Sequence, residues 1–310
     1  MKNLLIYSRD ASIYAECFER LQSNQVNLLY AGLAPQPKTL VVTDIVLGEP
    51  DLISSIIAKH NNIQWVQSSW AGNNKLQNTP YHEYMLTGVK GVFASQMSEY
   101  VLAYMLYFQR NIEHFLALKH AKQWLQLPSQ ALQDKTVGIM GMGSIGQAVA
   151  KTLSGFGMQV RGLVSQSKQS KKMALFTSGQ LSEFVQPCDY LVNLLPETKD
   201  TMGMCNEKFF ADMKKGSIFI NVGRGTVIDR PETLVNALES KHLSAAVLDV
   251  FEEEPLPASH IYFDTDNLHL SCHTAAVSDP KQVFAVFEEN LDRFLNKQAL
   301  LYQHDFSKGY

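Results

Sequence analysis

The chain has 310 residues, 45% of them hydrophobic and 18% charged, which is ordinary for a globular protein and long enough for two domains. Its 27 basic and 30 acidic residues give a net charge of −3 without a long block of either sign, which argues against nucleic-acid and membrane-surface partners. The longest apolar stretch, residues 100–108, is far shorter than the roughly 20 residues that span a bilayer. Four scattered cysteines without a Cys-x-x-Cys pair favour a reducing compartment, so we expect a cytoplasmic protein.

The first part of the chain alternates short apolar runs with segments of helical spacing. We predict strands at 4–7, 28–30, 40–42 and 65–67, and helices at 13–21 and 52–60. Strands that alternate with helices indicate right-handed crossovers and a parallel sheet. A last amphipathic helix at 281–295 is expected to return to this part of the chain.

Residues 97–124 carry the longest helical pattern, and we predict one helix there. Aromatic and aliphatic side chains recur at steps of three and four residues, with polar side chains between them. Such a wide apolar stripe is typical either of a helix buried in the core or of a subunit interface. The second interpretation predicts a homodimer.

A second alternating series follows. We predict strands at 136–140, 159–164, 190–195, 217–222, 245–250 and 268–271, with helices such as 147–154 and 232–240 between them. The fold class is therefore α/β, with two Rossmann-like doubly wound parallel-sheet domains and an interdomain cleft. We expect one domain to comprise residues 1–96 and 281–310, and the other residues 97–280.

A glycine-rich turn opens this second series. Gly141, Gly143 and Gly146 have the spacing G-x-G-x-x-G and lie between a predicted strand and a predicted helix. In this context the first glycine permits the tight turn, the second lets a pyrophosphate approach the backbone, and the third allows close helix–strand contact. The amides at the start of the helix then face the phosphates. The turn predicts a dinucleotide site.

The end of the next strand bears on which nicotinamide cofactor is bound. An NAD-selective site places an acidic residue there for the ribose 2′-hydroxyl, but residues 165–172 contain no Asp or Glu. Hydroxyl groups and a lysine can accept a 2′-phosphate, so the sequence favours NADP(H), with Ser165, Ser167 and Lys168 as candidate contacts and NAD(H) possible. The alternative is that these three are ordinary solvated loop residues.

Three reactive side chains each follow a predicted strand: Arg224, Glu254 and His273. Reduction of a 2-keto acid needs a bidentate cation for the substrate carboxylate, which arginine provides. It also needs a proton donor for the carbonyl oxygen, which histidine provides when a carboxylate orients it and stabilises its charged form. The three residues meet these requirements if they converge. Each of these side chains also has an ordinary interpretation when taken alone: an arginine that anchors a turn, a solvated glutamate, and a structural histidine.

Several segments in this order resemble the D-2-hydroxyacid dehydrogenases, and more narrowly their glyoxylate/hydroxypyruvate reductases. The matching segments span most of the chain: 70–72, 141–146, 193–198, 221–225, 248–257 and 269–276. The resemblance implies a dinucleotide-binding Rossmann domain inserted into a flavodoxin-like substrate domain. It implies hydride transfer from NADPH to C2 of small 2-keto acids such as glyoxylate and hydroxypyruvate.

The resemblance also assigns roles by position. It makes Arg224 the substrate-binding arginine, His273 the general acid/base, and Glu254, directly before a proline, the catalytic acid. It implies that backbone amides of Ala71 and Gly72 bind the substrate carboxylate. The cofactor contacts that it implies, besides the three glycines, are Ser144, Ile145, Leu195, Pro196, Thr201, Val222, Gly223 and Asp249. The segment around Trp124 resembles a stretch that, in related reductases, reaches toward a partner subunit.

The sequence departs from the family pattern at two places and leaves rival interpretations open. Cys272 replaces a common proline, and Asn73-Asn74 replaces a Val-Asp pair near the substrate. A metal site at His269, Cys272 and His273 lacks a second pair of ligands, so we expect no metal. The rival functions are a nucleotide-sensing binding protein of the same fold and a reductase of bulkier 2-keto acids.

Overall fold

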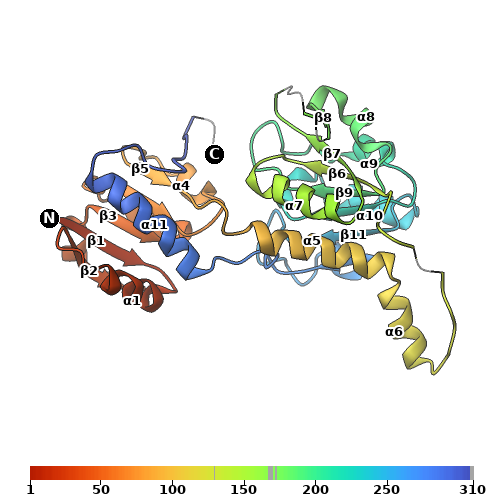
Figure 1. Cartoon of the computed structure of the whole chain (residues 1–310), viewed down its shortest axis with the longest axis horizontal. Helices are drawn as coiled ribbons and strands as arrows, with labels where there is room; N and C mark the ends of the chain where they lie inside the picture. Colours follow the sequence, from red (N-terminus) through yellow and green to blue (C-terminus); the bar gives the residue numbers. More distant parts are fainter. Residues whose placement is uncertain (129, 167–169, 172, 308–310) are drawn as a thin grey trace. The chain divides into compact units, whose positions relative to one another are not determined.

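The computed structural model describes residues 1–128, 130–166, 170–171 and 173–307. The chain divides into two compact units, unit 1 comprising Met1–Phe93 and Ser278–Tyr310, and unit 2 comprising Ala94–Val277 (Figure 1). The domain boundaries predicted from the sequence, between residues 96 and 97 and between residues 280 and 281, lie a few residues after the boundaries of these units. Each unit is an α/β fold built on a parallel sheet, as the fold class predicts.

Unit 1 is built on a five-stranded parallel sheet in the order β2-β1-β3-β4-β5, which is the strand order of flavodoxin-like folds. Its strands are β1 (Lys2–Tyr7), β2 (Val26–Ala31), β3 (Ile45–Gly48), β4 (Trp65–Ser68) and β5 (Met85–Thr87). Its helices are α1 (Ala11–Leu21), α2 (Pro37–Val41), α3 (Pro50–Ile57), α4 (Asn74–Gln77) and α11 (Pro280–Leu295). The buried Trp65 stacks on Phe287 of α11 with ring centroids 5.3 Å apart, so the last helix covers this sheet.

The strand predicted at 40–42 is wrong. Residues 37–41 form the short helix α2, which begins with Pro37, and the strand of this region is β3. Val41 and Val42 are 63% and 50% exposed, whereas all four residues of β3 are buried. The β-branched pair suggested a strand, but a proline at the first helical position favours a helix start.

Unit 2 contains a seven-stranded parallel sheet in the order β12-β11-β10-β9-β6-β7-β8. Its strands are β6 (Thr136–Met140), β7 (Gln159–Leu163), β8 (Ala174–Phe176), β9 (Tyr190–Asn193), β10 (Ile218–Asn221), β11 (Ala245–Leu248) and β12 (Leu268–Leu270). Its α-helices are α5 (Ala94–Gln109), α6 (Ile112–His120), α7 (Ser144–Gly155), α8 (Leu181–Val185), α9 (Glu207–Asp212) and α10 (Pro231–Glu239), and short 3₁₀ turns lie at 178–180, 225–227 and 261–264. The strand order reverses between β6 and β9, and ligands of such sheets bind at that switch point, beyond the carboxyl ends of the strands.

The single helix predicted at 97–124 is also wrong. Two helices, α5 and α6, replace it, and they are separated at Asn111, which adopts the left-handed conformation with φ 51°. Asparagine tolerates this conformation, and its side-chain amide donates a 3.1 Å hydrogen bond to the carbonyl oxygen of Pro128. Helix α5 packs on α7, whereas Figure 1 shows α6 extending away from the sheet of unit 2. None of the helices described is both long and apolar enough to cross a membrane.

Candidate active site

The glycine-rich turn connects β6 to α7 at the switch point. Gly141 has φ +100°, and a Cβ on it would lie 2.9 Å from the carbonyl oxygen of Leu194. A Cβ on Gly146 would lie 2.0 Å from the carbonyl oxygen of Gly141. In contrast, a Cβ on Gly143 would meet no heavy atom within 4 Å. The backbone is therefore tightly packed at the first and third glycines and leaves free space at the second. Such space fits a pyrophosphate that contacts the backbone there.

The other predicted cofactor contacts lie around this turn. Ser144 and Ile145 are the first residues of α7, where backbone N–H groups lack partners within the helix. The remaining ones follow β9, β10 and β11 at the same edge of the sheet: Leu195, Pro196, Thr201, Val222, Gly223 and Asp249. Ligands of such sheets bind at this edge, so these residues stay predicted cofactor contacts.

A pair of buried asparagines holds two of these loops, and the sequence analysis did not single them out as site residues. Asn193 ends β9 and donates a 2.8 Å hydrogen bond to Oδ1 of Asn221, which ends β10. Asn193 Oδ1 accepts from the amide of Leu195, and Asn221 Oδ1 accepts from the amide of Gly223. Each asparagine is a polar residue at the end of an apolar run, and this pattern in the sequence could have indicated them. The pair sets the course of both loops as they leave the sheet.

The loop that carries Arg224 is fixed on two sides. The side-chain amide of Asn221 donates a 3.0 Å hydrogen bond to the carbonyl oxygen of Arg224. A Cβ on Gly225 would lie 2.0 Å from the carbonyl carbon of Phe251, so only glycine permits this approach. The arginine loop therefore packs directly against the loop that precedes Glu254.

The guanidinium of Arg224 is half-buried and largely available to a ligand. Of the hydrogen bonds among the described residues it makes one, from Nη1 to the carbonyl oxygen of Gly223 at 2.7 Å. Burial lowers the pKa of Arg224 from its ordinary value, and the charges of Glu197 and then Glu254 oppose that effect. With five N–H donors on a guanidinium, most of them remain free for a carboxylate.

His273 and Glu254 form a hydrogen-bonded pair. His273 Nδ1 lies 2.8 Å from Glu254 Oε2, and Glu254 Oε1 accepts a 2.9 Å hydrogen bond from the amide of Phe251. The amide of His273 donates to the carbonyl oxygen of Asp249 at 2.7 Å. The two side chains are 53% and 35% exposed, so a substrate can reach them. Because Nδ1 faces the carboxylate, Nε2 is the ring nitrogen left for proton exchange.

Asp249 holds the segment that contains His273. Its carboxylate accepts hydrogen bonds from the hydroxyl of Ser271 at 2.6 Å and from the amides of Thr274 and Ala275 at 2.8 and 3.0 Å. The residue is 2% exposed. Its role as a cofactor contact remains a prediction, whereas these bonds show that it positions the histidine loop.

The predicted site residues belong to both units, and some of them lie outside the described residues. Arg224, Glu254 and His273 all belong to unit 2, whereas Ala71 and Gly72 follow β4 of unit 1. Ser165 is exposed just beyond β7, as a 2′-phosphate contact would require. Ser167 and Lys168 lie outside the described residues.

The proposed rival, a metal site near His269, finds no support in the geometry. The ring of His269 packs edge-on against Phe108 at 5.1 Å, and Nε2 lies 4.0 Å from Oε2 of Glu113. Burial lowers the pKa of His269. Within the part of the chain that the structure describes, no group of three or more His, Cys, Asp or Glu could hold a metal ion.

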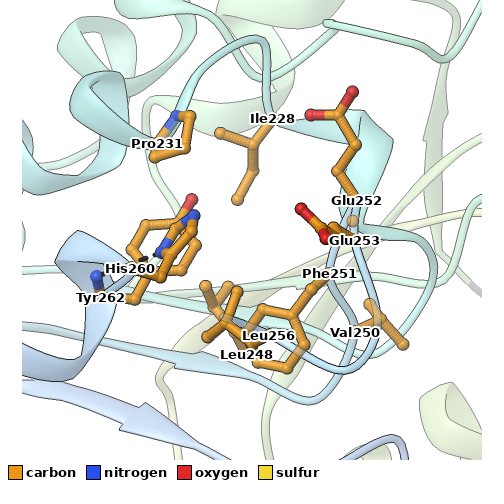
Figure 2. A pocket seen from close by; sticks show the side chains of 11 residues that line it. Ile228, Pro231, Leu248, Val250, Phe251, Glu252, Glu253, Leu256, His260 and Tyr262 are labelled. Atoms are coloured by element: carbon orange, nitrogen blue, oxygen red, sulfur yellow. Dashed lines mark hydrogen bonds between the residues drawn. The ribbon is translucent and has the colours of Figure 1, made fainter. Parts of the chain in front are cut away.

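A separate cavity of about 270 Å³ adjoins the loop after β11 (Figure 2). Its walls are Gly225, Ile228, Pro231, Leu248, Val250, Phe251, Glu252, Glu253, Leu256, His260 and Tyr262. Arg224, Glu254 and His273 are not among them. The cavity therefore lies beside the predicted reactive groups and does not contain them.

Comparison with known proteins places the chain in a family. Residues 102–275 match the family model described as D-isomer specific 2-hydroxyacid dehydrogenase, NAD binding domain. The chain belongs to the D-isomer-specific 2-hydroxyacid dehydrogenases. This confirms the predicted family and makes the protein an oxidoreductase with a nicotinamide-dinucleotide domain.

Relatives and solved structures agree with this assignment. The dehydrogenase is 35% identical to a glyoxylate/hydroxypyruvate reductase A of Klebsiella pneumoniae over 217 residues, 69% of each chain. It resembles the crystal structure of a D-isomer specific 2-hydroxyacid dehydrogenase family protein from Aeromonas salmonicida (32% identity, TM-score 0.91, 98% and 99% coverage). It also resembles an NADPH-dependent glyoxylate/hydroxypyruvate reductase from Sinorhizobium meliloti, crystallised with NADP and sulfate (28% identity, TM-score 0.88, 100% coverage of both chains).

Proposed function

We propose that this dehydrogenase reduces small 2-keto acids, such as glyoxylate and hydroxypyruvate, to 2-hydroxy acids with NADPH. The names of the relatives in Klebsiella and Sinorhizobium support the substrate class. The observation that carries the proposal is the packing of the Arg224 loop against the loop that leads to the Glu254–His273 pair. An arginine and a hydrogen-bonded glutamate–histidine pair at one edge of one sheet support this proposal, because they would supply a cation for a carboxylate and a proton donor.

The contacts of Arg224, His273 and Glu254 support a role for each. Arg224 binds the substrate carboxylate and the carbonyl oxygen through its free N–H groups. The family resemblance makes the amides of Ala71 and Gly72 candidate donors to the carboxylate. His273 donates the proton to the carbonyl oxygen from Nε2. Glu254 holds the imidazole through Nδ1 and stabilises its positive charge. When bound, NADPH supplies the hydride.

The cofactor proposal is NADP(H), with NAD(H) accepted more weakly. The open space at Gly143 and the free amides that begin α7 fit a pyrophosphate. Residues 165–172, just beyond β7, contain no carboxylate that would repel a 2′-phosphate. The Sinorhizobium relative crystallised with NADP agrees with this preference. Ser165, Ser167 and Lys168 stay candidate contacts for that phosphate.

The first experiment follows absorbance at the nicotinamide band with the purified protein, glyoxylate or hydroxypyruvate, and either NADPH or NADH. We expect fast NADPH oxidation and slow NADH oxidation. Activity with NADH alone would refute the cofactor preference and leave the chemistry standing. Nucleotide binding without turnover of either acid would instead favour a bulkier substrate or the nucleotide-sensing function.

We also propose that the protein is a homodimer that uses α6. Ile112, Phe115 and Leu116 are 41%, 42% and 50% exposed on this helix, and Trp124 beyond it is 97% exposed. Apolar side chains gathered on a projecting helix are typical of an interface. Light scattering should give twice the monomer mass, and Leu116→Asp should lower it, whereas His114→Asp on the same helix should not. A monomeric wild-type protein would refute this proposal.

The compartment we propose is the cytoplasm. Cys17, Cys188, Cys205 and Cys272 are all free thiols. Burial raises the pKa of Cys188 to about 12, which keeps this thiol protonated and unreactive. Such cysteines are typical of reducing compartments. Fractionation of the source cells would test the location.

A further inference from the structure

Glu197 is a carboxylate beside the substrate-binding arginine, and the proposed reaction does not use it. It lies beyond β9, whereas Arg224 lies beyond β10, and the two strands pair in register up to their last residues. Glu197 Oε2 accepts a 3.1 Å hydrogen bond from the hydroxyl of Thr226, which is next but one after Arg224. This bond holds the carboxylate on the same short loop as the guanidinium.

The charge of Glu197 acts on Arg224 directly. Burial lowers the pKa of Arg224, and the negative charges of two carboxylates oppose this effect. The contribution of Glu197 is larger than that of Glu254. Among the described residues, Thr226 is the one hydrogen-bond donor to the Glu197 carboxylate. The second carboxylate oxygen, Oε1, therefore accepts no hydrogen bond from them. Glu197 is half-buried, and its charge is therefore screened less than that of a fully solvated side chain.

These contacts determine what Arg224 can bind. The charges of Glu197 and Glu254 both act on Arg224, so the cation that attracts an anion has two carboxylates in its neighbourhood. A substrate with one carboxylate can pair that group with the guanidinium. A substrate with a second anionic group must place it near Glu197 and Glu254. Lys199, the next basic residue of this loop, is exposed to solvent.

We propose that Glu197 is a specificity-determining residue that excludes 2-keto acids with a second negative charge. The inference rests on the proposed function and narrows it to 2-keto monoacids whose remaining substituent is uncharged, such as glyoxylate and hydroxypyruvate. Two like charges roughly 6 Å apart, in a site of intermediate dielectric constant, repel by an amount that changes affinity about tenfold. Removal of the Glu197 charge should therefore increase the affinity for a dianionic 2-keto acid by that factor, and should leave the affinity for a monoanionic one unchanged.

Two probes of similar shape separate charge from size. Oxaloacetate ends in a carboxylate, and 4-methyl-2-oxopentanoate carries an isopropyl group in its place. Each is tested as an inhibitor of glyoxylate reduction by NADPH, with glycolate as the measured product, so that turnover of the probe is not required. The readout is the ratio of the two inhibition constants. Glu197→Gln removes the charge and keeps an acceptor for Thr226.

We expect Glu197→Gln to strengthen inhibition by oxaloacetate about tenfold relative to 4-methyl-2-oxopentanoate. Glu197→Asn, the second neutral variant, should shift the ratio in the same direction, and Glu197→Asp, which keeps the charge, should not. Glu253→Gln is the matched control, because this exposed carboxylate belongs to a different loop.

The outcomes separate this inference from the proposed function. An unchanged ratio in both neutral variants would overturn the role of Glu197 while glyoxylate reduction by the wild type stands. If neither probe inhibits the wild type or any Glu197 variant, the role of Glu197 is also overturned, because the size of the substituent would then decide selectivity. Failure of the wild-type protein to reduce any 2-keto acid would instead overturn the proposed function.

Discussion

The substitution Gly143→Ala tests whether the turn before α7 is a dinucleotide site. Gly143 has φ −71° and ψ −164°, which alanine can adopt, and an added Cβ meets no heavy atom within 4 Å. Loss of a glycine N-cap costs up to about 1 kcal/mol. The reduced entropy of the unfolded chain offsets about 0.4–1 kcal/mol of this loss. We therefore expect the free energy of unfolding to change by less than about 1 kcal/mol.

Binding of NADPH should change far more. The new methyl group would occupy the open space through which a pyrophosphate approaches the backbone. A hydrogen bond to a charged group is worth about 1.5–3 kcal/mol, so the loss of one amide–phosphate contact should raise the dissociation constant roughly 10- to 100-fold. Titration with NADPH, followed by nicotinamide fluorescence, measures this constant, and denaturant unfolding of the same protein measures stability.

Two further glycines of the same region provide the controls. Gly155 ends α7, and a Cβ there also meets no heavy atom, so Gly155→Ala should bind NADPH as the wild type does. Gly146→Ala should lower the melting temperature strongly, because its Cβ would lie 2.0 Å from the carbonyl oxygen of Gly141. Wild-type affinity for NADPH in Gly143→Ala would refute the assignment of the turn as the phosphate site.

Other predictions concern the reactive groups and the pH dependence of stability. Arg224→Lys should lower kcat/KM for glyoxylate roughly 100-fold in steady-state assays, since lysine cannot form the paired hydrogen bonds of a guanidinium; a loss below threefold would argue against bidentate binding. Glu254→Gln should lower kcat at least about 100-fold, because an amide cannot stabilise a charged His273; kcat near the wild-type value would remove Glu254 from catalysis. Partial burial raises the pKa of the Asp189 carboxyl. The hydrogen bonds from Lys214, at 2.7 Å, and from the amide of Thr136, together with the charges of Lys214 and Lys135, outweigh burial and hold that pKa below its usual range. This carboxylate stabilises the fold above its unfolded pKa, and the effect disappears as pH falls through the folded value, so Asp189→Asn should cost about 1 kcal/mol at pH 7 and almost nothing near pH 2 in denaturant titrations; an equal loss at both pH values would contradict this.

Local patterns predicted most of the sheet strands because each is a short apolar run between turn residues. The prediction at 136–140 coincides with β6, and the glycine-rich turn and helix follow it as expected. Local patterns failed where backbone chemistry at a single residue decided the outcome. Pro37 begins a helix where two valines suggested a strand, and Asn111 divides a continuous apolar stripe into two helices.

The sequence by itself determined the family, the α/β fold class and the types of reactive groups, because these depend on the order of elements and on residues at fixed spacing. Tertiary structure decided the contacts that these groups make. The resemblance already singled out Glu254 among the three adjacent glutamates, and the structure adds its 2.8 Å contact with His273 and the position of Glu252 and Glu253 in the wall of the neighbouring cavity. The contacts of Glu197 were also hidden in the sequence. Such pairs are distant along the chain, and they meet because parallel strands in register end at the same edge of the sheet.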